Sequence, residues 1–481
     1  MRRSVPYLAS TLGSMVLPFV TLPIMTRWLS PADYGIVAIG QVVASLFMGL
    51  ASLGVTAGLE RNFFQYEKNP RELGRLMHSG LVLVLVMTLG LGALMWAAAA
   101  PLAAWLLGDG MWGPLLWVMA ITSALGVMIT VQLVYLRNRG YATQYMIVSL
   151  GALVLEAALT IAGVAVADLG VWGLVAGPLL AKLVVTTILW TRMTLELPPA
   201  FEVKKVKELL GIGLPLLPRT CFGVADNGVD RLLVNWLQSL GQVGLFGIAN
   251  RIGYSVFSLM TAIEQLYVPE VYRLMFEGGR DGGVRIGRLL SPYFYVSIVL
   301  PSLVVLFTEE MLWVLVTPAF YGVTTAAAVL AAYYGQMFFG KIVGVQFVYA
   351  KKTWYTTPFA VLRLVTHLVA ALLLIPSFGA TGAALALLAT GLLVDGFAVA
   401  VAQRAYRIEY ELRVVIPGLA LLYGATAWIV GTVAMDVSYP ARLAGKVAIV
   451  AALLLFGWRW MAPMSARVIG VLRARGTMVR V

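Results

Sequence analysis

The sequence predicts an all-α polytopic membrane protein with about fourteen transmembrane helices. Hydrophobic residues make up 60% of its 481 residues and charged residues 12%, and the mean hydropathy is +0.89. A soluble domain carries about 25% charged residues, so most of the surface of this chain must face lipid. The second observation is a series of apolar segments, each about 20 residues or longer, which is enough to cross a bilayer as a helix.

The predicted spans follow one another with short junctions rich in turn-forming residues, such as "LSPADYG", "ADLG" and "PSFG". They are expected at residues 5–29, 34–58, 77–107, 112–136, 144–167, 170–192, 208–236, 242–268, 289–317, 322–350, 354–376, 379–403, 413–434 and 441–463. The first apolar segment runs on to Leu29, too far for a signal-peptide core, and indicates a retained first span.

The distribution of Lys and Arg predicts the orientation of the spans. Alternate loops are rich in these residues, whereas the opposite loops hold few of them, with Arg27, Arg442 and Lys446 as exceptions. Because basic loops stay in the cytoplasm, both termini are expected there, which requires an even number of spans. The net charge of +13 is therefore explained by orientation rather than by nucleic-acid binding.

The first twelve spans repeat as two units of six. "WLSPADYGIVAIGQV" from Trp28 resembles "WLQSLGQVGLFGIANR" from Trp236. Aligning Gly35 with Gly244 gives an offset of 209 positions, and the same offset aligns "LGVWGLVAG" with "FGATGAALA". "VYLRNRGY" matches "VYAKKTWY" at an offset of 214. Six is an even number, so the two repeats are parallel and related by a pseudo-two-fold axis along the membrane normal, a transporter architecture. The predicted domains are an N-terminal six-helix lobe (1–195), a C-terminal six-helix lobe (203–408), two additional transmembrane helices (409–464) and a basic cytoplasmic tail (465–481).

Ionisable residues inside the predicted spans are unusual in a membrane protein. They are Glu156, Lys182, Arg219, Asp226, Asp230, Arg251, Glu264, Lys341, Arg363 and Asp395. Each would cost several kcal/mol facing lipid, so these side chains must face an interior or a water-filled cavity. Two interpretations stay open: ion pairs that lock helices together, or a site that binds a charged ligand. Glu264, near the cytoplasmic end of its span, is expected to be interfacial or paired.

The sequence offers little for catalysis or metal binding. Its single cysteine, Cys221, excludes an internal disulfide and a cysteine-based metal site, and two histidines, His78 and His367, exclude a His-rich one. The catalytic motifs HExxH and GxSxG are absent. The protein is therefore not expected to be an enzyme.

Two stretches resemble a known family. "TRWLSPADYGIVAIGQVVASLFMGLASLGV", followed by "LERNFFQYEKN", resembles the opening of the polysaccharide-type lipid flippases, the Wzx-like branch of the multidrug/oligosaccharidyl-lipid/polysaccharide exporter superfamily. "GLPLLPRTCFGVADNGVDRLLVNWLQSLGQVGLFGIANRI" resembles the start of the second half of these proteins. The resemblance covers about residues 5–410. It implies flipping of a polyprenyl-pyrophosphate-linked oligosaccharide across the bacterial inner membrane, from the cytoplasmic to the periplasmic leaflet, by alternating access, for cell-surface polysaccharides such as O-antigen.

The same resemblance implies the partners. These are the lipid-linked glycan, membrane lipids and other polysaccharide-assembly proteins; nucleic acid is not expected, and the protein is expected to be a monomer. No cofactor is expected apart from a coupling ion, H⁺ or Na⁺.

A pyrophosphate-linked substrate needs a cationic, hydrated cavity, because Lys and Arg bind phosphate oxygens well. The predicted substrate-binding residues are Lys182, Arg219, Arg251, Arg363 and Arg61. The predicted ion-coupling or gate residues are Asp226, Asp230, Arg231, Glu156 and Asp395. For Asp226, Asp230 and Arg231 the alternative is a local Asp–Arg lock.

Two other functions fit this class of fold. A drug/cation antiporter should have an acidic cavity, but here the bases are at least as numerous as the acids among the intramembrane charges. A non-transporting membrane scaffold should lack charges inside its spans, yet they are present.

Overall fold

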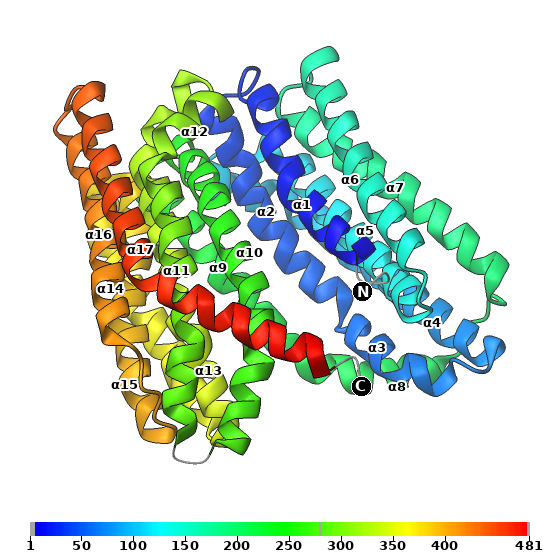
Figure 1. Cartoon of the computed structure of the whole chain (residues 1–481). Helices are drawn as coiled ribbons and strands as arrows, with labels where there is room; N and C mark the ends of the chain where they lie inside the picture. The colour runs from blue at the N-terminus through cyan, green and yellow to red at the C-terminus, as the bar shows by residue number, and fades with distance from the viewer. Residues whose placement is uncertain (1–4, 279–280, 479–481) are drawn as a thin grey trace. The chain divides into compact units, whose positions relative to one another are not determined.

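The computed structural model describes residues 5–278 and 281–478. Within these ranges it describes all side chains except those of 219–227, 459–478 and a few positions in the first and tenth helices. The described residues form helices joined by short turns, and no strand occurs among them (Figure 1). The predicted all-α polytopic class is confirmed.

The chain divides into two compact units. The first comprises Met1–Gly247 and Leu315–Ala319, and the second comprises Ile248–Val314 and Phe320–Val481. The first unit holds α1 (Val5–Met25), α2 (Pro31–Ser52), α3 (Val55–Tyr66), α4 (Pro70–Leu107), α5 (Gly113–Asn138), α6 (Ala142–Ile161), α7 (Val171–Glu196), α8 (Val203–Gly213), α9 (Leu217–Leu237) and the start of α10 (Leu240–Glu277). The second holds the rest of α10, α11 (Gly282–Leu306), α12 (Thr308–Leu315) except its last residue, α13 (Thr324–Tyr349), α14 (Thr356–Thr390), α15 (Gly396–Ala405), α16 (Leu412–Ala434) and α17 (Tyr439–Met478). The predicted domain limits at residues 195, 203, 408 and 464 stay predictions.

Among the described residues, 11 helices are long and apolar enough to cross a membrane. One of them, Thr353–Ala405, covers two predicted spans, because α14 has non-helical torsion angles at Gly379. The chain folds back there: a Cβ on Gly382 would lie 2.3 Å from the carbonyl oxygen of Leu374. The predicted spans at 5–29 and 208–236 correspond to α1 and to α8 with α9, which are not among the 11. The count of fourteen stays a prediction.

Local chemistry explains where the helices begin. Ser30 and Asp33 form a capping box at the start of α2, in which Ser30 Oγ accepts from Asp33 N at 3.2 Å and Asp33 Oδ2 accepts from Ser30 N at 2.8 Å. Asn69 caps α4 by accepting from the backbone N–H groups of Arg71 and Glu72. Such caps satisfy backbone donors that a helix start leaves without partners.

Two features support the predicted internal repeat. Gly170, before α7, and Gly379, inside α14, are 209 positions apart, and both have φ 54° and ψ −129°. A side chain makes this conformation strained, so glycine is required at both turns. At the same offset, Gly35 and Gly244 make reciprocal contacts: a Cβ on Gly35 would lie 1.9 Å from Leu240 O, and one on Gly244 would lie 1.9 Å from Pro31 O.

Two sequence expectations need correction. α5 and α13 end with the same hydrogen bond, Tyr141 N to Leu136 O and Lys352 N to Phe347 O, each 2.9 Å long. These residues correspond at an offset of 211, so the predicted offset of 214 is wrong for this turn. The proline-containing segments "LPFVTLP" (17–23) and "GIGLPLLP" (211–218), at matching positions of the two repeats, are also expected to break their spans. "GIGLPLLP" does interrupt a helix, since α8 ends at Gly213 and a 3₁₀ turn precedes α9. The matching break expected in the first span is wrong, because α1 continues through Pro18 and Pro23; membrane helices tolerate proline when neighbours satisfy the backbone.

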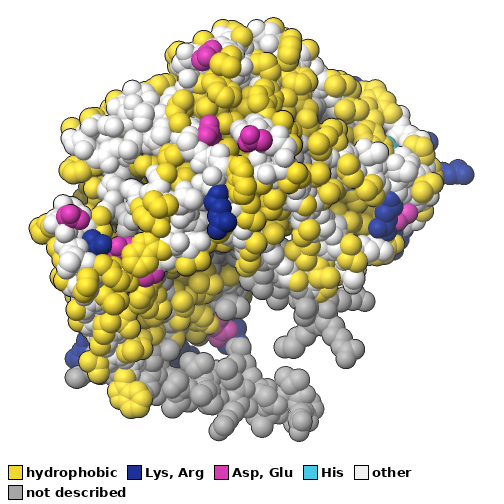
Figure 2. Space-filling model, turned by 90° about the horizontal axis from the view of Figure 1, so that it is seen from above, with side chains coloured by type: hydrophobic (Ala, Val, Ile, Leu, Met, Phe, Trp, Pro, Cys, Tyr) yellow, Lys and Arg dark blue, Asp and Glu magenta, His cyan; other side chains and the backbone are white. Residues whose placement is uncertain are grey.

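The described surface is largely apolar. Leu94 and Leu373 expose 69% and 71% of their area, and many other large hydrophobic side chains are exposed. On the face drawn in Figure 2, hydrophobic side chains cover most of the described surface and charged ones are scattered. Such a surface suits contact with lipid, as expected for a multi-pass membrane protein.

Candidate functional site

The turn at Gly379 brings two predicted site residues together in the second unit. Arg363 lies on α14 before the turn, and Asp395 lies after it, at the end of the π-helix η7 (Gly391–Asp395). Arg363 Nη2 and Asp395 Oδ1 form an ion pair. π-Helical turns occur frequently at functional sites. Arg363, predicted to bind substrate, and Asp395, predicted to couple an ion, are therefore in direct contact.

A polar network continues from this pair into the unit. Arg363 Nη1 donates to Tyr333 Oη at 3.2 Å. One helical turn further along the chain in α13, Gln336 Oε1 accepts from Tyr423 Oη at 2.5 Å. Asp395 Oδ2 is buried and has no hydrogen-bond partner among the described residues. One carboxylate oxygen is thus held by the guanidinium while the other remains able to accept a proton or a cation.

The equivalent hairpin of the first unit carries Glu156 on α6 and Lys182 on α7. Close contacts of Gly177 with the Thr160 backbone, and of Gly173 with Gly163, set the register of these antiparallel helices. Glu156 lies one turn before Thr160, and Lys182 lies just over one turn after Gly177, so both charges occupy similar depths. Both are half-buried, and neither forms an ion pair with another described residue.

The cluster predicted on α9 is described in part. Asp230 is buried, and Arg231 Nη1 donates to Ala38 O of α2 at 3.4 Å. The side chains of Arg219 and Asp226 lie outside the described residues. Whether this cluster acts as an outer gate or as an Asp–Arg lock stays a prediction.

The two remaining predicted substrate-binding residues are exposed. Arg251 lies on α10 within the second unit, and Arg61 lies on α3, where its Nη1 donates to Asn62 Oδ1 at 2.8 Å. The predicted roles of both residues stay predictions.

Glu264 was expected to be either interfacial or paired, and in the structure it is paired. Its carboxylate forms an ion pair with Lys341 of α13, and Lys341 also donates to Thr261 Oγ1 at 3.2 Å. Lys341 Nζ lies 5.1 Å from the centre of the Phe257 ring. This cation is therefore satisfied by its neighbours within the second unit.

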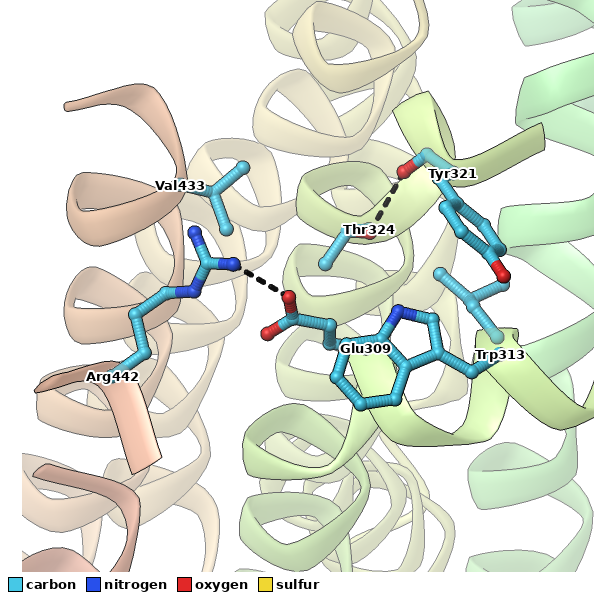
Figure 3. A pocket seen from close by; sticks show the side chains of 7 residues that line it. Glu309, Trp313, Tyr321, Thr324, Val433 and Arg442 are labelled. Atoms are coloured by element: carbon cyan, nitrogen blue, oxygen red, sulfur yellow. Dashed lines mark hydrogen bonds and ion pairs between the residues drawn. The ribbon is translucent and has the colours of Figure 1, made fainter. Parts of the chain in front are cut away.

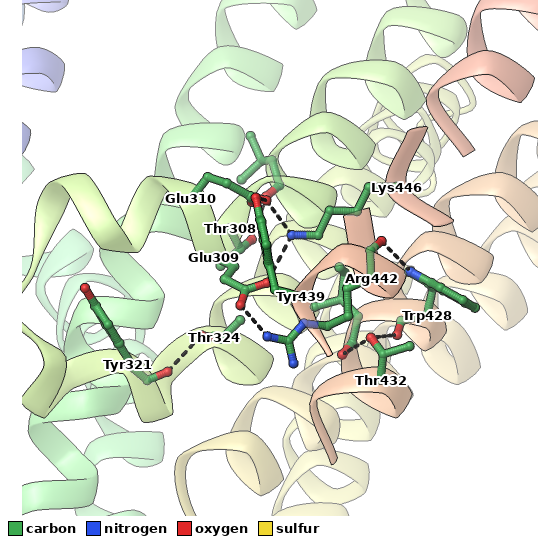
Figure 4. A network of polar contacts seen from close by, with 12 residues as sticks. Thr308, Glu309, Glu310, Tyr321, Thr324, Trp428, Thr432, Tyr439, Arg442 and Lys446 are labelled. Atoms are coloured by element: carbon green, nitrogen blue, oxygen red, sulfur yellow. Dashed lines mark hydrogen bonds and ion pairs between the residues drawn. The ribbon is translucent and has the colours of Figure 1, made fainter. Parts of the chain in front are cut away.

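Sequence reasoning missed a second charged network, which explains two exceptions to the loop-charge pattern. Arg442 Nη2 lies 2.7 Å from Glu309 Oε1, and the fully buried Lys446 lies 3.1 Å from Glu309 Oε2 and 2.7 Å from Glu310 Oε1. Tyr439 Oη also donates to Glu310 at 2.9 Å. Figure 4 shows these residues converging from α12 and α17. The sequence did contain a signal for this network. Glu309 and Glu310 lie near the end of the predicted span 289–317, on the same predicted side of the membrane as the unexpected bases Arg442 and Lys446.

Outside the predicted spans, Lys205 of α8 is buried in a structural role. Its Nζ lies 3.0 Å from Glu72 Oε2, 3.8 Å from Glu208 Oε2 and 3.5 Å from the centre of the Tyr66 ring. Burial acts to lower the pKa of Lys205, but its hydrogen bonds to Tyr66 and Glu72 and the charge of Glu208 raise that pKa above the ordinary value overall. This ammonium fastens α8 to α3 and α4.

No group of three or more His, Cys, Asp or Glu side chains that could hold a metal ion occurs among the described residues.

Parts of the chain are similar in sequence to known proteins. Residues 24–275, more than half of the chain, match the model of a family described as polysaccharide biosynthesis protein. "Lsg locus putative protein 1" of Haemophilus influenzae is 23% identical over 281 residues; the match spans 56% of this chain and 66% of that relative, just under two thirds of its length.

Solved structures share the fold at low identity. The lipid II flippase MurJ, in an inward closed conformation, gives a TM-score of 0.70 at 11% identity, covering 96% of this chain and 99% of MurJ. An inward-facing multidrug resistance MATE family transporter of the MOP superfamily gives 0.60 at 15% identity, covering 84% of this chain and 96% of the transporter. A flippase and a transporter, neither of them an enzyme, thus have this architecture. The resemblance to polysaccharide-type flippases is confirmed, and the chain belongs to the polysaccharide biosynthesis protein family.

Proposed function

We propose that this protein flips a polyprenyl-pyrophosphate-linked oligosaccharide from the cytoplasmic to the periplasmic leaflet of the bacterial inner membrane. Movement occurs by alternating access, and both termini lie in the cytoplasm. Membership of a polysaccharide biosynthesis family and a fold similar to a lipid II flippase support this substrate class. Other polysaccharide-assembly proteins are the expected partners at the cytoplasmic and periplasmic faces.

The observation that carries the proposal is the state of Lys182. Its side chain is half-buried in α7, and its Nζ lies 3.9 Å from where a Cβ on Gly126 of α5 would be. Among the described residues it has no acidic partner, whereas Lys341, Arg363 and Lys446 are all in ion pairs. A cation at membrane depth is costly unless it is paired or hydrated. An anionic substrate such as a pyrophosphate would provide the missing partner.

Ion coupling is assigned to Asp395. A proton or a sodium ion on its second oxygen would compete with Arg363 for the carboxylate and weaken the ion pair across the Gly379 hairpin. Release of the ion would restore the pair. Occupancy of Asp395 would therefore bias the conformation of this hairpin, which is what an ion-driven cycle requires.

A drug/cation antiporter of the same fold is the rival function, and Glu156 is the observation in its favour. This half-buried carboxylate has no ion-pair partner among the described residues and could attract a cation. Lys182 lies at a similar depth in the same hairpin and opposes that attraction.

Transport in proteoliposomes separates the two functions. Purified full-length protein is reconstituted with a fluorescent polyprenyl-pyrophosphate-linked sugar, and the fraction accessible to a membrane-impermeant quencher is followed with time. We expect flipping of this lipid and no uptake of the cationic dye ethidium. Ethidium uptake without lipid flipping would favour the antiporter, and neither activity would favour the scaffold.

The coupling ion is tested in the same vesicles. A pH gradient or a sodium gradient is imposed separately, and the rate of flipping is compared with that in its absence. We expect one gradient to accelerate flipping in the wild type and not in Asp395→Asn, whereas Glu156→Gln keeps the response. An unchanged response in Asp395→Asn would remove this residue from coupling.

A further inference from the structure

A cavity lies within the second unit, beside the network of Glu309, Glu310, Arg442 and Lys446. Its volume is about 180 Å³, and Glu309, Trp313, Tyr321, Thr324 and Arg442 line it. One water molecule needs roughly 10–15 Å³ of such space, so the cavity has room for a ligand much larger than water. Figure 3 shows the Glu309 carboxylate between Arg442 and the indole ring of Trp313, with Thr324 and Tyr321 above them in the view.

The charges around this cavity cancel. Two carboxylates, Glu309 and Glu310, are matched by two cations, Arg442 and Lys446, and all four are held in ion pairs. A phosphate or a free cation entering here would break this balance and compete with well-formed pairs. The ligand that fits is therefore uncharged.

The polar groups at the wall still have hydrogen-bonding capacity. Arg442 Nε is buried and has no hydrogen-bond partner among the described residues. Thr324 Oγ1 donates to Tyr321 O at 2.8 Å, which leaves its own lone pairs able to accept. The carboxylate of Glu309 has lone pairs beyond the two contacts it makes with Arg442 and Lys446. Hydroxyl groups can donate and accept, so a ligand rich in hydroxyls can satisfy all three sites.

Two aromatic rings supply an apolar surface beside these polar groups. Trp313 is 44% exposed, and its ring centre lies 4.8 Å from that of Tyr439. Tyr321 also lines the cavity. The C–H faces of a sugar ring pack on such aromatic surfaces, while its hydroxyls reach the polar groups; pockets of this mixed kind fix the orientation of a ligand.

We propose that this cavity is a binding site for one neutral sugar ring of a glycan, separate from the intramembrane charges of the transport cycle. The predicted orientation places it at the periplasmic end of α12 and α17, where it would meet a glycan that has crossed the membrane. The source of the sugar rests on the proposed function, but binding itself does not depend on transport.

Saturation-transfer NMR tests the site on purified full-length protein in a detergent without a sugar headgroup. The probes are the methyl glycosides of glucose, galactose, mannose and N-acetylglucosamine, with phosphoethanolamine as a lipid-headgroup probe. We expect at least one glycoside to receive saturation, and Trp313→Ala to bind it roughly 2- to 10-fold more weakly, as loss of an aromatic contact predicts. Trp458→Ala is the matched control, because Trp458 is 80% exposed on α17 and does not line the cavity.

Three results would overturn the site: no glycoside bound by the wild type, equal binding in wild type and Trp313→Ala, or binding of phosphoethanolamine alone. If Trp313→Ala does not fold, as judged by size-exclusion chromatography, Tyr321→Phe and Thr324→Val take its place. Unchanged glycoside binding in both would likewise overturn the proposal. Transport failure with intact glycoside binding would contradict the proposed function and leave the sugar site standing.

Discussion

The hairpins that turn at Gly170 and Gly379 have the same turn geometry and use their charges differently. In the first unit an acid, Glu156, comes before the turn and a base, Lys182, after it, and no ion pair joins them. In the second unit the order is reversed, and Arg363 and Asp395 are paired. The two hairpins thus share a backbone geometry but differ in their charges. We call the first, whose charges are not paired with each other, the open hairpin, and the second, with its Arg363–Asp395 ion pair, the closed hairpin.

The position of a π-helix accompanies this difference. In the first hairpin it lies before the turn, as η2 (Ala162–Val166), and in the second it lies after the turn and ends on Asp395. A π-turn adds one residue, which rotates the following side chains by about 100° relative to a regular helix. The backbone repeat therefore sets the depth of each charge, and the π-helix that ends on Asp395 changes the direction of that side chain.

Removing one partner of the closed pair should have the largest effect on stability. Asp395→Asn leaves Arg363 without its carboxylate in a largely buried setting, and we expect a loss of about 3 kcal/mol in the free energy of unfolding. Chemical unfolding of the purified protein measures it. The control is the double variant Arg363→Met with Asp395→Leu, which removes both charges and should recover most of the loss. Equal stability of Asp395→Asn and the wild type would show that the pair contributes nothing.

Changing the turn glycines should have an intermediate effect, equal in the two hairpins. Gly170→Ala and Gly379→Ala each force a side chain into φ 54°, ψ −129°, and we expect a cost of about 1–3 kcal/mol for each. Gly151→Ala in α6 is the matched control, because a Cβ there meets nothing within 4 Å and alanine favours a helix by about 0.5–1 kcal/mol. Unequal costs at the two turns would contradict the repeat.

These particular residues show how far sequence reasoning reaches. Aligning "LGVWGLVAG" with "FGATGAALA" placed both turn glycines, since a strained turn accepts no other residue. The pairing of Arg363 with Asp395 was not predicted, although the residues are 32 positions apart with Gly379 at their midpoint. That symmetry puts them at one depth of an antiparallel hairpin, but side-chain direction depends on the π-helix, which has no sequence signature.

The partners of Lys446 in the network with Glu309 and Glu310 could not be predicted from the sequence for a different reason. Lys446 was recognised as an exception to the charge pattern, and its partners lie 136 and 137 positions earlier in the chain. Nothing in local periodicity links two helices so far apart. Packing of α16 and α17 against α11, which leads directly into α12, brings them together in the second unit.

Removing the acid of the open hairpin should have the smallest effect. Glu156 has no ion-pair partner among the described residues, so Glu156→Gln keeps shape and loses little, and we expect a change within about 0.5 kcal/mol. The same chemical unfolding experiment measures it beside Asp395→Asn. A loss as large as that of Asp395→Asn would mean that Glu156 is also locked and that the two hairpins do not differ.

The rate of lipid flipping by Lys182 variants tests whether the first hairpin binds the substrate. A hydrogen bond between an ammonium and a phosphate contributes about 1.5–3 kcal/mol, so Lys182→Ala should slow flipping of the polyprenyl-pyrophosphate-linked sugar by roughly 10- to 100-fold. Lys182→Arg should retain part of the activity, because it keeps the charge. Lys207→Ala, which removes an exposed base on α8, should flip at the wild-type rate. Wild-type flipping by Lys182→Ala would contradict the claim that the open hairpin holds the substrate.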